Sequence, residues 1–259
     1  MDARIRTVRV TRYVTPLREG GSLPAIVEAD DEGMYVLKFR GAGQGARALI
    51  AELVSGEIAR ALGLPVPEIV FAELDPELAR TEPDPEIHAL IHESAGLNLG
   101  LDYLPGSVTY DPIVQKPEAD LAARIVWFDA YVTNVDRTAR NTNMLMWHKR
   151  LWLIDHGATL YFHHSPGWDA DPARARDPFP LIRTHVLIAR AAALAAVDES
   201  LAGALTSEVI AGIVNAIPEA WLTAEPGHDA PALRAAYARY LVERLTAPRP
   251  FVEEAAGAR

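Results

Sequence analysis

The segment from residue 134 to residue 157 constrains the fold of this chain more than any other. It begins with a loop rich in Asp and Asn, continues as an apolar strand, a basic turn and a second apolar strand, and ends in Asp155-His-Gly. Two apolar strands joined by a short turn indicate a β-hairpin. A hairpin brings its open ends together, so we expect Asp136, an Asn of the loop and Asp155 to meet at one end of a small sheet.

The side chains expected at that end all carry oxygen atoms. Carboxylate and amide oxygens are the ligands that Mg²⁺ prefers, and phosphoryl transfer also needs a carboxylate beside the attacking hydroxyl. Both Asn141 and Asn143 are candidates for the amide ligand. The alternative interpretation is an Asx-rich turn that only caps the preceding helix, but such a turn does not require Asp155.

Composition excludes several classes of protein. The 259 residues contain no cysteine, which rules out disulfides, thiolate metal sites and cysteine nucleophiles. A formal net charge of -10 argues against a nucleic-acid partner. No apolar run approaches the roughly 20 residues of a membrane helix, and the first residues lack the apolar core of a secretory signal. We therefore expect a cytoplasmic protein without a membrane span.

The pattern of apolar residues predicts an α+β fold with two lobes and a cleft between them. Residues 1–105 are β-rich with one helix; the expected strands are 8–14, 25–28, 34–39, 66–74 and 87–91, the helix is 46–62, and 75–85 is a solvated loop. Residues 106–259 are helical with the embedded hairpin; the expected helices are 116–132, 181–196, 206–216 and 230–245, and the tail from 253 is frayed.

Lys38 lies on an apolar strand, and Glu52 lies on the helix that follows it. A buried ammonium requires a charged partner, and a glutamate on a helix packed over the sheet supplies one. Glu57 is the competing partner, on a different face of the helix. The alternative for Lys38 is an edge-strand lysine whose ammonium reaches solvent.

Two glycine segments could offer backbone N–H groups to phosphates. Gly20-Gly21-Ser22 precedes a strand, and the segment 41–45 leads into the helix with Glu52. Neither is a GxGxxG, and no Walker motif is present, which argues against a P-loop NTPase. A metal-dependent hydrolase that uses His156, His163 and His164 is a further alternative, although no HExxH spacing supports it.

Four features occur in this order along the chain: Lys38, Glu52, Asn134-x-Asp136-Arg137-x-x-x-Asn141 and Ile154-Asp155-x-Gly157. Together they resemble the HipA-like kinases, which belong to the protein-kinase-like superfamily together with the phosphatidylinositol kinases. The helix that ends in Leu62-Gly-Leu-Pro-Val-Pro67 is similar as well. The similarity covers most of residues 20–165. It departs from eukaryotic kinases where Asn134 replaces a His, where His156 replaces a Phe, and in the lack of an Ala-Pro-Glu segment.

The resemblance implies a bilobal protein-kinase-like fold that binds ATP and Mg²⁺ between the lobes. In such a fold Lys38 contacts the phosphates and Glu52 orients it, with Gly20, Gly21 and Ser22 as further nucleotide contacts. Asp136 is the catalytic base, and Arg137 stabilises the loop or the transferring phosphate. Asp155 binds Mg²⁺ with Asn141, which matches the family's spacing, or with Asn143, which directly precedes the strand. The adenine contacts are expected near residues 91–97, with Ile91 and Glu93 as candidates.

The expected function is therefore transfer of the ATP γ-phosphate to a hydroxyl acceptor, for which a protein Ser or Thr is favoured over a lipid or a small molecule. The alternative is a pseudokinase, a nucleotide-binding or scaffold module without turnover, which the weak glycine loop and the missing Ala-Pro-Glu segment suggest.

Overall fold

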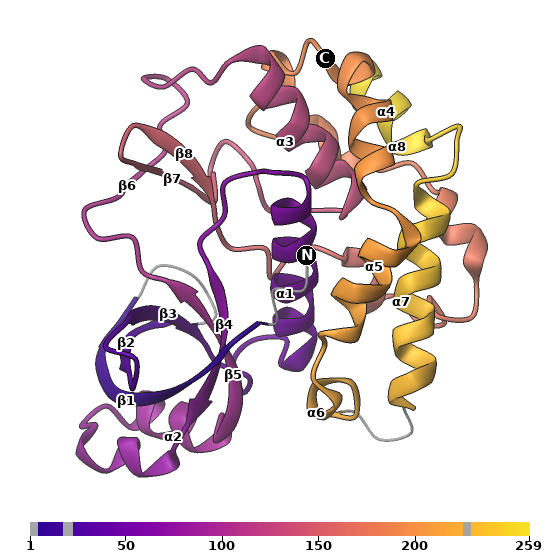
Figure 1. Ribbon diagram of the computed structural model, residues 1–259. Coiled ribbons are helices and arrows are strands. Elements are labelled where there is room, and N and C mark those ends of the chain that lie inside the picture. The colour runs from indigo at the N-terminus through magenta and orange to yellow at the C-terminus, as the bar shows by residue number, and fades with distance from the viewer. Residues whose placement is uncertain (1–4, 18–22, 225–228) are drawn as a thin grey trace.

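A mixed α+β architecture surrounds one central helix in the computed structural model, which describes residues 5–17, 23–224 and 229–259. The central helix is α1 (Ala46–Ala61). A β-barrel and a small sheet lie on one side of α1, and the helices α5 to α7 lie on the other (Figure 1). The prediction of α+β is confirmed at this level.

The barrel has the strand order β1-β2-β3-β5-β4 and is closed. Its strands are β1 (Thr7–Pro16), β2 (Ala25–Ala29), β3 (Met34–Lys38), β4 (Ile69–Leu74) and β5 (Gly96–Asp102). Neighbouring strands are antiparallel except β1 and β4, whose parallel pairing closes the ring. The sequence predicted four of these strands, β1 to β4, but neither β5 nor the closure of the ring.

Strand β3 determines where Lys38 points. Its residues alternate in burial, with Tyr35 and Leu37 inside the barrel and Val36 and Lys38 on the opposite face. That outer face lies toward α1, and Val36 packs against the hydrophobic cluster that includes the buried residues of α1. The period of two along the strand therefore directs Lys38 to the helix that carries Glu52.

Helix α1 packs very closely on the barrel. A Cβ atom added at Gly56 would lie 2.4 Å from Ile69 Cδ1 of β4, so a larger residue there would require the Ile69 side chain to move. The helix ends at Ala61, and Gly63, whose φ of 69° is in the left-handed region, turns the chain away. The Leu64 N–H donates back to the Ala59 carbonyl at 2.9 Å.

The strand predicted at 87–91 is wrong, because this segment belongs to helix α2 (Pro85–Glu93). The Asp84 side chain accepts a hydrogen bond from the N–H of Glu86 and caps the helix. Ile87, Leu90 and Ile91 recur at helical spacing and cover the barrel interior. Part of the expected loop 75–85 forms a 3₁₀ helix, η1 (Pro76–Thr81).

The hairpin prediction is confirmed. Helix α3 (Ala119–Tyr131) leads into the Asp- and Asn-rich loop, after which β7 (Met144–Trp147) pairs antiparallel with β8 (Arg150–Leu153). A short strand, β6 (Val108–Thr109), completes a three-stranded sheet.

Two predictions for the C-terminal half are wrong. The helix predicted at 181–196 is replaced by the 3₁₀ turns η4 (Pro180–Thr184) and η5 (Ile188–Arg190), followed by α4 (Leu194–Ala204). The tail is ordered as α8 (Pro250–Gly257), because Phe251 is fully buried against Trp127. The remaining elements are η2 (Tyr161–His164), η3 (Pro172–Arg176), α5 (Ser207–Asn215), α6 (Glu219–Leu222) and α7 (Ala230–Arg244).

None of the helices in the described part of the chain has both the length and the apolar character needed to cross a bilayer.

Candidate active site

Lys38 is nearly buried between two carboxylates. Its Nζ lies 2.7 Å from Asp155 Oδ1 and 3.7 Å from Glu52 Oε2, and its side chain is 11% exposed. Burial alone would lower the pKa of this ammonium, but the negative charges of Glu52 and Asp155 outweigh that effect and raise the pKa above its usual value. Lys38 is therefore charged and held at a fixed place.

Glu52 is the partner on α1, and its carboxylate also binds the chain just beyond Asp155. The backbone N–H of His156 donates to Glu52 Oε1 at 3.0 Å, and His156 Nδ1 lies 3.3 Å from the same oxygen. Burial would raise the pKa of Glu52, but Lys38 and His156 lower it to about 2. Glu57, the competing candidate, pairs with Arg60 at 3.5 Å instead.

We expect an acid-induced loss of stability that involves Glu52. A carboxylate whose pKa is lowered on folding stabilises the protein above its unfolded pKa, and this contribution disappears as the pH falls through the folded pKa. For Glu52 the window runs from the ordinary value of 4.5 down to about 2. Urea unfolding at pH 6 and pH 3 should show a smaller decline for Glu52→Gln than for the wild type. Glu57→Gln is the control: burial raises the pKa of Glu57, so this substitution should not reduce the decline in stability at low pH. An unchanged decline in Glu52→Gln would contradict the prediction.

The Asp136 carboxylate is oriented by both candidate asparagines. Asn141 Nδ2 donates to Asp136 Oδ2 at 2.7 Å, and Asn143 Nδ2 donates to the same atom at 3.1 Å. The Asp136 N–H donates to Asn134 Oδ1 at 3.0 Å. The side chain of Asp136 is thus held by its own loop.

A buried charge cluster lies beneath the loop. Asp129 of α3 accepts hydrogen bonds from Arg137 Nε at 2.7 Å, from His185 Nε2 at 2.8 Å and from Asn134 Nδ2 at 2.7 Å. Burial would raise the pKa of Asp129, but Arg137, His185 and Asn134 lower it to about 2. Asp129 and His185 are not among the residues predicted from the sequence. For Asp129 the available signal was an Asp within the apolar run Ile125-Val-Trp-Phe-Asp129-Ala-Tyr.

Arg137 is a structural support of the loop. Its guanidinium has no exposed side-chain area, so the predicted contact with a transferring phosphate has no support in its position. It donates to the carbonyls of Asn143 and, at 3.5 Å, of Ile154. These carbonyls lie next to unusual backbone: Asn143 and Asp155 have φ values of 47° and 55°, which are unfavourable for residues with a Cβ. Arg137 thus connects Asp129 to both ends of the hairpin.

The hairpin joins the two halves of the site. The Ile154 N–H donates to the Asn143 carbonyl at 3.0 Å, which extends the pairing of β7 with β8 by one step. Asn143, whose amide contacts Asp136, therefore lies beside Asp155, whose carboxylate contacts Lys38. Two groups of contacts, Glu52-Lys38-Asp155 and Asn143-Asp136, are thus joined by the backbone pairing of Asn143 with Ile154, the residue before Asp155.

Other predicted site residues are not part of this cluster. Gly20, Gly21 and Ser22 lie outside the described residues. The Ile91 side chain is fully buried in the barrel core, and Glu93 is exposed at the end of α2. Their role in adenine binding is therefore without support from their positions. In the second glycine segment, the Gly41 N–H donates to Ser94 Oγ at 3.0 Å.

The histidines have partners within the protein. His163 lies between the Tyr237 hydroxyl, 2.9 Å from its Nδ1, and the His164 ring, 3.1 Å from its Nε2. Burial, followed by the charges of His164 and Arg47, keeps the pKa of His163 well below its usual value. Within residues 5–17, 23–224 and 229–259, no three His, Asp or Glu side chains are grouped so that they could hold a metal ion.

Comparison with known proteins points to kinases. The sequence profile of the HipA-like kinase family matches residues 10–248. Among solved structures, the Helicobacter pylori proinflammatory kinase CtkA is similar with a TM-score of 0.56 and 11% identity, over 97% of this chain and 98% of that one. The Golgi casein kinase is similar with a TM-score of 0.50 and 12% identity, over 98% of this chain and 72% of that one. No curated protein sequence matches the chain. At these identities the two structures show a shared fold.

Proposed function

Because this chain belongs to the HipA-like kinase family, we propose that it transfers the γ-phosphate of ATP to a hydroxyl group with the help of Mg²⁺. The observation that carries the proposal is that Lys38 contacts both Glu52 and Asp155, and that Asn143, whose amide donates to Asp136, pairs through its carbonyl with the residue before Asp155. These residues come from the barrel, from α1, from the loop and from the end of the hairpin. A protein Ser or Thr is the favoured acceptor.

In this proposal residues 1–105 form the nucleotide-binding lobe, and residues 106–259 supply the loop and the metal ligands. Lys38 would bind the phosphates as a point charge, Glu52 would hold its ammonium in place, and Asp155 would serve as a metal ligand. The low pKa of Glu52 supports this role, because it keeps the carboxylate ionised throughout the physiological range.

The donor set at the hairpin end fits Mg²⁺. Asp155 offers a carboxylate that is 42% exposed, and Asn143 keeps its amide oxygen available while its Nδ2 donates to Asp136. Mg²⁺ binds proteins through one or two carboxylates together with phosphates and waters, and it would neutralise charge on the phosphates. We propose Asn143 rather than Asn141 as the amide ligand, because its backbone is paired with Ile154, next to Asp155.

Asp136 orients the acceptor hydroxyl and receives its proton. Two amide donors on one of its oxygens restrict the carboxylate to a single orientation. A proton acceptor must be positioned within hydrogen-bond reach of the attacking group, so this restriction favours catalysis.

The first test measures nucleotide binding and turnover in parallel. Calorimetry should show ATP binding that is tighter with Mg²⁺, and radiolabelled ATP should transfer phosphate to a panel of Ser/Thr proteins, lipid headgroups and sugars. Binding without transfer to any acceptor would favour the pseudokinase alternative. The absence of nucleotide binding by the folded protein would reject the proposed function.

A second test distinguishes the two asparagines. Asn143→Ala should raise the Mg²⁺ concentration needed for half-maximal transfer about tenfold or more, because it removes a metal ligand. Asn141→Ala should change this concentration by less than threefold. Asp155→Asn should abolish the effect of Mg²⁺ on ATP affinity, and Asp120→Asn, an exposed change at the start of α3, is the control. A larger effect in Asn141→Ala than in Asn143→Ala would overturn the assignment.

A further inference from the structure

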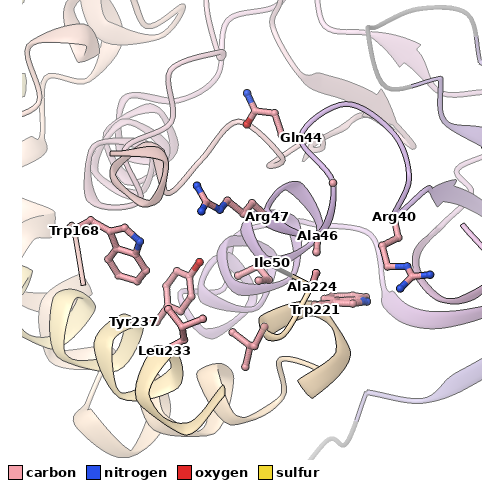
Figure 2. A pocket seen from close by; sticks show the side chains of 12 residues that line it. Arg40, Gln44, Ala46, Arg47, Ile50, Trp168, Trp221, Ala224, Leu233 and Tyr237 are labelled. Carbon is pink, nitrogen blue, oxygen red and sulfur yellow. The ribbon is translucent and has the colours of Figure 1, made fainter. Parts of the chain in front are cut away.

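A cavity lies behind α1, away from the contacts between Lys38 and Glu52. It has a volume of about 280 Å³ and lies between the first turns of α1 and the elements α6 and α7. Ile50 lines it, and residues two apart on a helix point in nearly opposite directions, so the cavity is on the side of α1 opposite Glu52. Figure 2 shows the side chains around it.

The lining combines positive charge with aromatic rings. Arg40 and Arg47 contribute guanidinium groups, and Trp168, Trp221 and Tyr237 contribute rings. Trp168 and Tyr237 lie toward one end of the cavity, and Trp221 lies with Arg40 toward the other (Figure 2). None of the described lining residues carries a carboxylate. Guanidinium groups bind carboxylates and phosphates through paired hydrogen bonds, and aromatic rings bind flat apolar groups.

The walls of the cavity are held by contacts to the rest of the protein. The Trp221 Nε1–H donates to the Leu97 carbonyl of β5 at 3.1 Å, and the Trp221 ring contacts Phe71 of β4 with ring centroids 5.7 Å apart. On the other side, Arg47 donates to the His163 carbonyl at 3.0 Å. The site is therefore built from parts of the chain that are far apart in sequence and held by contacts within the protein.

Helix α1 connects this cavity to the proposed active site through the segment 155–163. Arg47 contacts His163 at one end of the segment, and Glu52 contacts His156 at the other. Between them, the Ser55 and Thr159 hydroxyls lie 2.6 Å apart in the core. The two carboxylates that hold Lys38 are those of Glu52, which lies on α1, and of Asp155, which directly precedes His156. Because Glu52 binds His156, a displacement of α1 would move both carboxylates.

We propose that the cavity is a regulatory site for a small aromatic anion, in which a ring lies among the aromatic side chains and a carboxylate or phosphate binds the arginines. The cavity exists in the conformation in which Lys38 is paired with Glu52. A ligand that binds this conformation stabilises it and raises the affinity for nucleotide, and by reciprocity nucleotide raises the affinity for the ligand. The regulatory part of the inference rests on the proposed function; the binding part does not.

The binding test uses phenylacetate and phenyl phosphate as probes and neutral phenylacetamide as their control. Calorimetry with the 259-residue chain should show that both anions bind and that phenylacetamide binds at least tenfold more weakly. Arg40→Gln and Arg47→Gln should each weaken anion binding about tenfold, because a charge-assisted hydrogen bond is lost. Leu233→Trp places a larger side chain from α7 in the cavity and should abolish anion binding. Arg60→Gln, at the exposed end of α1, is the matched control and should have no effect.

The coupling test compares the affinity for a non-hydrolysable ATP analogue with and without saturating phenylacetate. We expect affinity to rise three- to tenfold in the wild type and not to change in Leu233→Trp. The ATP analogue should not displace phenylacetate from the wild type, which separates this cavity from the nucleotide site.

The outcomes separate the two proposals. If nucleotide binds and phenylacetate does not, or if phenylacetate binding is unaffected by both arginine variants, the assignment of the cavity is wrong and the proposed function stands. If both ligands bind and neither affects the affinity of the other, the regulatory role is wrong. If phenylacetate binding depends on the arginines and no nucleotide binds, the cavity is a ligand site and the proposed function fails.

Discussion

Replacement of Asp136 by asparagine is expected to lower the rate of phosphoryl transfer about a thousandfold. A positioned proton acceptor contributes roughly 10²- to 10⁴-fold to a rate. The substituted amide keeps the shape of the carboxylate, and its oxygen still accepts from Asn141 and Asn143, so the loop should be preserved. The measurement is single-turnover transfer of radiolabelled phosphate, together with ATP affinity by calorimetry.

The expected pattern is a loss of rate with an unchanged affinity for ATP, because Asp136 contacts the acceptor rather than the nucleotide. Asp120→Asn removes a carboxylate of the same kind from the exposed first turn of α3 and should leave the rate within twofold of the wild type. Transfer by Asp136→Asn within threefold of the wild type would show that this carboxylate does not take part in proton transfer.

The second large effect concerns stability. Asp129→Asn should lower the free energy of unfolding by about 3–5 kcal/mol, because it leaves the Arg137 guanidinium buried without a counter-charge. Both side chains of this pair have no exposed area, and the pair distance is 2.7 Å. His185 would lose its carboxylate partner in the same change. Urea unfolding of the purified variant measures the loss.

An exposed ion pair provides the matched control. Glu77 and Arg80 are 2.8 Å apart, with side chains that are 67% and 76% exposed, and Glu77→Gln should cost less than about 1 kcal/mol. The double variant Asp129→Asn/Arg137→Gln should recover part of the lost stability, because it removes the uncompensated charge. A loss below about 1 kcal/mol in Asp129→Asn would show that the cluster does not stabilise the loop.

Local patterns predicted the elements that carry the site. Alternation along residues 34–38 and helical spacing along 46–61 correctly placed Lys38 on a strand and Glu52 on a helix. The two apolar runs around the basic turn correctly predicted β7 and β8. These elements are determined by neighbouring residues, because the periods of strand and helix differ and each period is visible within one segment.

The errors occur where a local pattern is ambiguous. The segment 87–91 is short and apolar, and periodicity cannot distinguish a short buried strand from a helix turn. The tail from residue 253 has few large apolar residues, yet Phe251 inserts among Trp127 and Tyr131, and Arg249 pairs with Asp198. The order of the tail comes from these tertiary contacts, which lie more than 50 residues away along the chain.

The amino-acid sequence alone determined the chemistry of this protein: which oxygen and nitrogen groups are present, their order, and the hairpin that brings Asn143 beside Asp155. The tertiary structure decided which groups are partners. It selected Glu52 over Glu57, directed Arg137 into the core against Asp129 and His185, and created the cavity behind α1. The physical reason is that the periodicity of a segment shows which face of its helix or strand is apolar. Which other helix or strand packs against that face depends on contacts between segments that are distant in the sequence.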